Sequence, residues 1–258
     1  MTILDSIILG ILQGLTEFLP VSSSGHLVLV EKLLGHKDVP LLYDILLHVA
    51  SLLAVFIFFR KKLFNLAKEC ASFKYNKSHK YVLMILAATI VTTAMLFVTK
   101  PVMKSIKAEP VYLTAAFAFT AILLLLAQSF FKKAVPDKEI TLKDALFIGF
   151  FQGIAVLPGV SRSGSTITGA LFRKIPAAEA VEFSFMLAIP AILGALLLEL
   201  VKGGFAFIDP VPSAVGFIVS FVSSLAALRL LVFMMKKTIL YPFAIYLFAI
   251  SALVPFVV

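Results

Sequence analysis

Six long apolar stretches limit what this chain can fold into, because a helix that crosses a bilayer needs about 20 consecutive apolar residues. Polar linkers separate the stretches, and their spacing favours a single membrane domain over residues 1–258. Of the 258 residues, 61% are apolar and 14% are charged, whereas about a quarter of a soluble domain is charged. The sequence therefore predicts an all-α integral membrane protein. The predicted spans are 41–59, 81–98, 111–131, 183–201, 211–235 and 239–258.

The net charge of +9 indicates an orientation in the membrane and not a nucleic-acid partner. Lys and Arg gather in the short linkers, and cytoplasmic loops of membrane proteins are the more basic ones. Residues 60–80 hold seven of them and residues 132–143 hold four, against three in 99–110 and one in 202–210. We therefore expect 60–80 and 132–143 in the cytoplasm, with 99–110 and both termini outside.

Residues 2–34 and 141–174 are two copies of one repeat, and from Thr2 to Gly25 they are compared without gaps at an offset of 139. Nine of the 24 aligned positions are identical, whereas chance would give about two. Both copies open with a T-x-x-D capping box, continue as an apolar run and end in a cluster of Pro, Ser and Gly. The sequence therefore predicts two similar helices that break at similar points.

Each copy is too short to cross the membrane as a helix. About 14 residues at 1.5 Å per residue reach about 20 Å, less than the hydrocarbon core of about 30 Å. We therefore expect two re-entrant hairpins whose broken tips are buried in protein or line a wet cavity. The number of crossings between them places the hairpins in opposite leaflets, as inverted repeats that begin near residues 2 and 141.

The two tips carry different ionisable residues. The first has Glu17 and His26, whereas the second has Arg162. Charged side chains are costly at membrane depth and usually have a function there. Arg and hydroxyl groups suit phosphate oxygens, a carboxylate suits a divalent cation, and a His suits proton transfer. This division between the copies predicts phosphoryl chemistry at a site shared by both tips.

Structural roles are the alternatives for several of these residues. Ser and Gly in membrane helices often serve close packing. Glu17 and Arg162 would also serve as an ion pair that holds the hairpins together. Asp44 and His48 lie four residues apart in the predicted span 41–59, where they would form either a proton relay or a structural pair.

The tips resemble those of the bacitracin-resistance family of undecaprenyl-diphosphatases. That family has an (E/Q)-x-x-x-E helix that runs into a P-V-S-S-x-G-H tip, and a second tip of the form P-G-x-S-R-S-G-x-T. The runs Glu182 to Pro190 and Tyr241 to Tyr246 also look like the family, so that the resemblance covers nearly the whole chain. The matching tip motifs are Gln13 to Glu17, Pro20-Val21-Ser22-Ser23-Ser24-Gly25-His26 and Pro158-Gly159-Val160-Ser161-Arg162-Ser163-Gly164-Ser165-Thr166.

The resemblance implies hydrolysis of undecaprenyl diphosphate to the monophosphate, which recycles the carrier lipid for cell-wall glycans. It implies a site open to the outer face of the plasma membrane and a divalent cation, Mg²⁺ or Ca²⁺, with Glu17 either binding the metal or orienting the substrate. Arg162 would clamp the diphosphate, and Ser23 would attack with His26 as its proton partner. The nucleophile stays open between Ser23, His26 and water. The expected substrate-binding residues are Gln13, Ser22, Ser161, Ser163, Gly164 and Thr166.

A secondary transporter or lipid flippase for an anionic substrate is the alternative function, because such proteins use inverted repeats with broken helices. It predicts substrate movement without bond cleavage. A different class of lipid phosphatase shares the triplet Ser24-Gly25-His26, but Thr168 stands where that class requires a His. The expected partners are the polyprenyl diphosphate lipid and membrane lipids, and a homodimer is left open.

Overall fold

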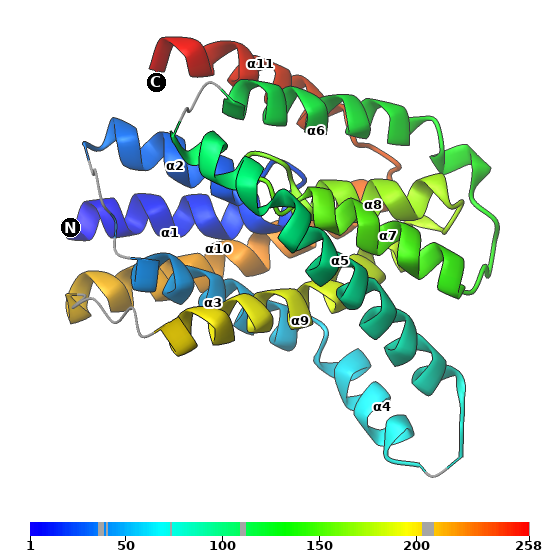
Figure 1. The fold of residues 1–258 in the computed structure, drawn as a ribbon. Coiled ribbons are helices and arrows are strands. Elements are labelled where there is room, and N and C mark those ends of the chain that lie inside the picture. Colours follow the sequence, from blue (N-terminus) through cyan, green and yellow to red (C-terminus); the bar gives the residue numbers. More distant parts are fainter. Residues whose placement is uncertain (36–38, 40, 73, 109–111, 203–208, 258) are drawn as a thin grey trace.

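The computed structural model consists of helices and their connections throughout the residues that it describes, which are 1–35, 39, 41–72, 74–108, 112–202 and 209–257 (Figure 1). The helices are α1 (Ile3–Phe18), α2 (Ser23–Leu33), α3 (Leu41–Phe58), α4 (Arg60–Cys70), α5 (Lys77–Ala108), α6 (Tyr112–Gln128), a 3₁₀ turn η1 (Phe131–Lys133), α7 (Leu142–Ile154), α8 (Arg162–Phe172), α9 (Ala177–Lys202), α10 (Pro210–Lys236) and α11 (Tyr241–Val257).

Each of the six predicted spans is helical over most of its described length. Within the described residues, three helices are long and apolar enough to cross a membrane: Lys77–Thr99 of α5, Ala177–Leu198 of α9 and Pro210–Lys236 of α10. A fourth is added if α3 and α4 count as one bent span, and α6 and α11 are shorter apolar helices. The protein is therefore a membrane protein built of helices, as its composition predicts.

Two predicted linkers contain helix. In the range 60–80, the helix α4 follows α3 at a bend of 74°. Its Arg, Lys, Leu and Ala residues favour helix, and its two-sided pattern, with Leu66 buried and Phe64 exposed, is typical of a helix at an interface. In the range 99–110, α5 continues as far as Ala108. These ranges were predicted to be linkers because they are rich in Lys, and a high content of Lys does not prevent a segment from being helical. Of the linker 202–210, residues 203–208 lie outside the described part of the chain.

The repeat is visible in the two short helices α1 and α7. The Thr2 and Thr141 side chains each accept a hydrogen bond from the backbone of the Asp three residues on, and each Asp accepts one in return, so both predicted capping boxes are confirmed. With 16 and 13 residues, α1 and α7 are about 24 and 20 Å long. In Figure 1, α1 begins at the left end of the bundle and α7 at the right end, and both run toward its middle.

Equivalent helices of the two repeats pack in matching pairs. The helix α1 lies along α10 and α7 lies along α5, while α3 also contacts α10 and α9 also contacts α5. The helix α2 contacts α11, and α8 contacts α6. Buried aromatic residues from both halves meet around the ends of the short helices, where the Phe18 and Phe185 rings pack edge to face at 5.3 Å. The core of the molecule therefore sits where the two repeats meet.

Ion pairs fix the chain around the start of α7. The Glu139 carboxylate lies 2.9 Å from the ammonium groups of both Lys77 and Lys80, which lower the pKa of Glu139 from 4.5 to about 2. The buried carboxylate of Asp144 accepts a hydrogen bond of 2.6 Å from Nε of Arg173. These contacts join the start of α5 and the end of α8 to the segment around the start of α7.

A close approach of α1 to α10 depends on Gly14. A Cβ atom at this position would lie 2.0 Å from Oγ of Ser223 and 2.5 Å from the carbonyl oxygen of Ser220. Both are atoms of α10, and the second belongs to the backbone, which cannot rotate away. Small residues therefore allow the two helices to pack with their backbones close together, as is common in membrane helices.

We predict that Gly14→Ala destabilises the protein, because crowding of a packed interface costs about 1–3 kcal/mol. Gly194→Ala is the matched control, because a Cβ atom there meets nothing within 4 Å. Thermal unfolding in detergent, followed by circular dichroism, should show a lower midpoint for Gly14→Ala and an unchanged or higher one for Gly194→Ala. Equal midpoints for Gly14→Ala and the unmodified protein would contradict the packing argument.

Candidate active site

The breaks between α1 and α2 and between α7 and α8 touch each other. The hydroxyl of Ser163 donates to the carbonyl oxygen of Leu19 at 3.2 Å. A Cβ atom on Gly25 would lie 2.9 Å from Cα of Gly159 and 2.5 Å from the ring of Phe117. Glycine at position 25 is therefore what allows the first tip to approach the second this closely.

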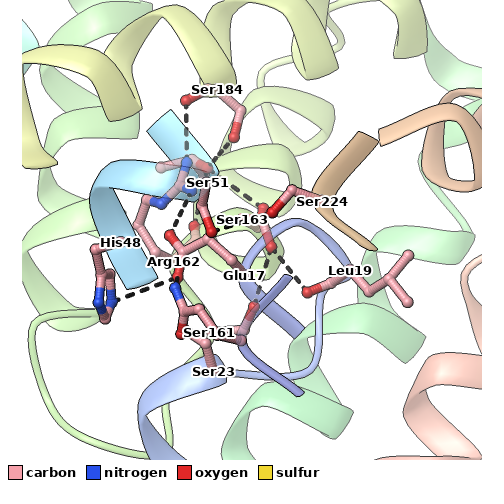
Figure 2. Close-up of polar contacts among 12 residues, drawn as sticks. Glu17, Leu19, Ser23, His48, Ser51, Ser161, Arg162, Ser163, Ser184 and Ser224 are labelled. Atoms are coloured by element: carbon pink, nitrogen blue, oxygen red, sulfur yellow. Dashed lines mark hydrogen bonds and ion pairs between the residues drawn. The ribbon is translucent and has the colours of Figure 1, made fainter. Parts of the chain in front are cut away.

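Glu17 and Arg162 form an ion pair across the two tips (Figure 2). Nη2 of Arg162 donates to Oε1 of Glu17 at 3.0 Å, and the side chains are only 15% and 7% exposed. Nη1 of Arg162 donates to the carbonyl oxygen of Ser184 on α9 at 3.4 Å. A buried charge is tolerated when it is paired and its remaining hydrogen-bonding positions are filled. The ion pair thus fixes the carboxylate of one repeat against the guanidinium of the other.

The other oxygen of Glu17 collects hydrogen bonds from its own repeat. Oε2 accepts one of 2.6 Å from the hydroxyl of Ser23 and one of 3.2 Å from the amide nitrogen of Gln13. Nε2 of His48 on α3 lies 3.7 Å from the same oxygen. The carboxylate is therefore the centre of the site, and the hydroxyl of Ser23 is oriented by it.

His26 lies on the same tip but makes different contacts from those predicted. Its Nδ1 lies 2.7 Å from the carbonyl oxygen of Ser22, and its Nε2 lies 2.8 Å from the hydroxyl of Tyr246 on α11. The predicted pairing of His26 with Ser23 is thus not the one in the structure, where Ser23 donates to Glu17. Nδ1 of His26 bonds to the carbonyl oxygen four residues before it, as Nδ1 of His48 does with the carbonyl oxygen of Asp44.

Ser22 adopts a backbone conformation that few residues other than glycine adopt. Its φ of 72° lies in the left-handed region, whereas its repeat counterpart Ser161 has a φ of −72°. Such outliers cost on the order of 1–3 kcal/mol and gather at functional sites. Ser22 also caps α2, because its hydroxyl accepts from the backbone of Gly25 at 3.4 Å. The two tips therefore differ in backbone as well as in side chains.

The hydroxyl residues of the second tip are used to build that tip. Ser161 caps α8 by accepting from the backbone of Gly164 at 3.0 Å, and its hydroxyl lies 3.2 Å from that of Ser163. The hydroxyl of Thr166 lies 2.5 Å from that of Ser184. All of these side chains are buried. Their contact with a substrate stays a prediction, and the contacts in the structure hold the loop around Arg162 in place.

Two helices start at the contact between the tips. Ser23 is the first residue of α2, and Arg162 is the first residue of α8. The N-terminus of a helix carries a partial positive charge and backbone N–H groups that are free to bind an anion. Arg162 adds a full positive charge, and its guanidinium has five N–H donors, of which the contacts above use two. The arrangement is suited to an anion with several oxygens, such as a diphosphate.

Three neighbours of the site were not picked out by the tip motifs. Ser184 and Tyr246 reach it from α9 and α11, and they lie in the two runs, Glu182 to Pro190 and Tyr241 to Tyr246, that resemble the family without indicating a role for either residue. His48 was considered as part of a relay with Asp44, and its Nδ1 donates to the backbone carbonyl of Asp44 at 2.8 Å. Because that bond turns Nε2 toward Glu17, His48 belongs to the site through the carboxylate of the first tip.

The residues present fit a divalent cation that is shared with a substrate. No group of three His, Cys, Asp or Glu side chains among the described residues is arranged to hold a metal by itself. However, Oε1 of Gln13 is buried without a hydrogen-bond partner, four residues before Glu17. Mg²⁺ and Ca²⁺ prefer oxygen ligands, and Mg²⁺ is usually bound by one or two carboxylates together with substrate phosphates. Glu17 supplies one such carboxylate, and Gln13 supplies an amide oxygen beside it.

Comparison with known proteins gives one consistent result. The family model described as "Bacitracin resistance protein BacA" matches residues 6–253. An "Undecaprenyl-diphosphatase" of Treponema denticola is 43% identical over 253 residues, which is 96% of this chain and 94% of the relative. Proteins of the same name from Carboxydothermus hydrogenoformans and Alkaliphilus metalliredigens are each 36% identical, over 96% and 98% of this chain and 94% and 98% of their own lengths. This chain therefore belongs to the bacitracin resistance protein BacA family.

Proposed function

We propose that this protein hydrolyses undecaprenyl diphosphate to undecaprenyl phosphate and inorganic phosphate, and so recycles the lipid carrier of cell-wall synthesis. The family and the names of the relatives support the reaction and the substrate. The observation that carries the proposal is the network in which Glu17 holds Arg162 of the opposite tip and the hydroxyl of Ser23. It combines a binding group for phosphate with an oriented hydroxyl.

The two tips would meet inside the plasma membrane as the ends of inverted repeats. The opposite starting points of α1 and α7 and the matching packing pairs support two re-entrant hairpins, α1–α2 and α7–α8, from opposite leaflets. The basic residues of α4 and of the η1 region support a cytoplasmic location for that end of the bundle. The first hairpin would then start from the outer face, and the site would open toward that face.

The diphosphate would bind at the two helix starts. Arg162 would donate its remaining N–H groups to the phosphate oxygens without releasing Glu17, because the guanidinium is a planar fork with donors on three sides. The N-termini of α2 and α8 would add backbone donors. The polyprenyl chain would remain in the surrounding lipid.

Ser23 would supply the attacking oxygen. As its Oγ bonds to the terminal phosphorus, the hydroxyl proton passes to Glu17, and the bridging oxygen leaves with undecaprenyl phosphate. Water then hydrolyses the phosphoserine, releasing inorganic phosphate and restoring the Ser23 hydroxyl. His26 would accept the proton of that water, because it lies three residues after Ser23 and therefore on the same face of α2.

A divalent cation would be held by Glu17 and Gln13. When bound, it would neutralise charge on the diphosphate and so favour departure of undecaprenyl phosphate. A flippase would need the same anion site, but it has no use for a hydroxyl that is oriented by a carboxylate. The contact between Ser23 and Glu17 therefore favours the hydrolase.

We predict that Arg162→Lys lowers kcat/KM about 10²–10³-fold, which is what the loss of one transition-state donor costs in other enzymes. Arg173→Lys is the matched control, because Arg173 also pairs with a buried carboxylate, that of Asp144, away from the tips. Phosphate release from undecaprenyl diphosphate in detergent measures both. Similar activity of Arg162→Lys and Arg173→Lys would place the phosphate site elsewhere.

We predict that Ser23→Ala abolishes turnover, whereas Ser24→Ala, whose hydroxyl lies 3.4 Å from that of Ser22, retains it within a few-fold. Mass spectrometry of the protein during turnover should detect a phosphate on Ser23 and none in Ser23→Ala. Ordinary turnover by Ser23→Ala would remove Ser23 as the nucleophile and leave water or His26.

We predict that EDTA suppresses phosphate release and that Mg²⁺ or Ca²⁺ restores it. Gln13→Ala should raise the cation concentration needed for half-maximal activity, because it removes an oxygen ligand, and Gln13→Glu should lower it. The readout is activity as a function of free cation, with Gln152→Ala as the control at the equivalent position of the second repeat. Full activity in EDTA would exclude a cation requirement.

A further inference from the structure

The imidazole of His26 is held from both of its nitrogens. The carbonyl oxygen of Ser22 can only accept a hydrogen bond, so Nδ1 at 2.7 Å must carry the proton. Nε2 of a neutral ring then has a lone pair, and this lone pair faces the hydroxyl of Tyr246 at 2.8 Å. The tautomer is thus set by a backbone carbonyl on one side and by a phenol on the other.

Two aromatic rings also pack against the same imidazole. The ring of Tyr246 lies nearly parallel to the imidazole, at an interplanar angle of 7° and a centroid distance of 5.6 Å. The ring of Phe117 on α6 meets the imidazole at 67° and 5.2 Å. Rotation of His26 about its side-chain bonds would therefore break two hydrogen bonds and move it against two aromatic rings.

Tyr246 comes from the opposite end of the sequence, 220 residues after His26. Its side chain is partly exposed, with 42% of the residue accessible, so packing alone does not require a tyrosine here. A phenylalanine would keep the same ring contact. What only tyrosine supplies is a hydroxyl that donates to Nε2.

We propose that Tyr246 is a positioning residue that holds His26 as the Nδ1–H tautomer, with Nε2 in a fixed direction for proton transfer. This role rests on the proposed hydrolase function, in which His26 accepts a proton from water. The Tyr246 hydroxyl keeps the lone pair of Nε2 in place until the reacting water replaces it. Without the hydroxyl, the ring keeps its bond to Ser22 but loses the second anchor that prevents rotation.

The test is Tyr246→Phe, with Tyr241→Phe as the control on the same helix. Tyr246→Phe should lower kcat on the order of tenfold, about the value of one neutral hydrogen bond, and leave KM within about twofold. Tyr241→Phe should change neither. In the background of His26→Ala, adding Tyr246→Phe should have no further effect, because both residues act through one imidazole.

Nitrogen NMR of the protein with labelled histidine gives a readout independent of activity. The chain has four histidines, and His26→Gln identifies the signal of His26. We expect a neutral ring with the proton on Nδ1, and in Tyr246→Phe a shift of the Nε2 resonance to that of a free lone pair. A His26 signal that is unchanged in Tyr246→Phe, or a proton on Nε2 in the unmodified protein, would overturn the proposal.

The two measurements separate the failure of this proposal from the failure of the proposed function. If the unmodified protein releases no phosphate from the lipid, the hydrolase assignment fails, and the NMR signal still shows whether Tyr246 anchors His26. If the protein is active and Tyr246→Phe has an unchanged kcat, the positioning role fails and the hydrolase assignment stands.

Discussion

The ion pair between Glu17 and Arg162 is the constraint on which the site depends. Each charge sits on a short helical segment inside an apolar protein, and an unpaired charge there would cost several kcal/mol. Neither repeat carries the partner for its own charge, because Val156 stands in the second copy where the first has Glu17, and Ser23 stands in the first where the second has Arg162. The pair can therefore form only where the two tips meet. Gly25 and the bond from Ser163 to Leu19 then allow the contact to be close.

The two repeats have the same helices, but equivalent polar residues make different contacts in each. The capping box at Asp5 is repeated at Asp144, which is further buried and paired with Arg173. Gln13 donates to Glu17 in the first copy, whereas Gln152 donates to the hydroxyl of Thr92 in the second. At the glutamine position, the second copy thus fixes one helix to another, whereas the first copy directs the side chain to Glu17 in the site. Because the fold is duplicated, the two tips can carry different ionisable residues on the same helix–break–helix backbone.

The sequence was sufficient to predict the features that follow from a local residue pattern or from the alignment of the two repeat copies. It predicted the apolar helices, the capping boxes and the pair of ionisable tips. It could not predict the acceptor of the Ser23 hydroxyl, because Glu17 lies on α1 and Ser23 on α2, and their contact depends on how the chain turns between the two helices. Nor could it predict the contact between Tyr246 and His26, because this contact joins α2 to the last helix and depends on the packing of the whole bundle. The helix α4 was missed because charge marked it as a loop, although its residues favour helix.

The negative charge of Glu17 beside a diphosphate is the reason that the proposed chemistry includes a cation. Arg162, Ser23 and Gln13 already donate to its two oxygens, and His48 lies 3.7 Å away. A diphosphate that binds to Arg162 brings several negative charges beside this carboxylate, and at low dielectric their repulsion is strong. One guanidinium cannot neutralise both anions. A divalent cation would offset that repulsion, and Glu17 together with the buried Oε1 of Gln13, which lacks a partner, would be the residues to hold it.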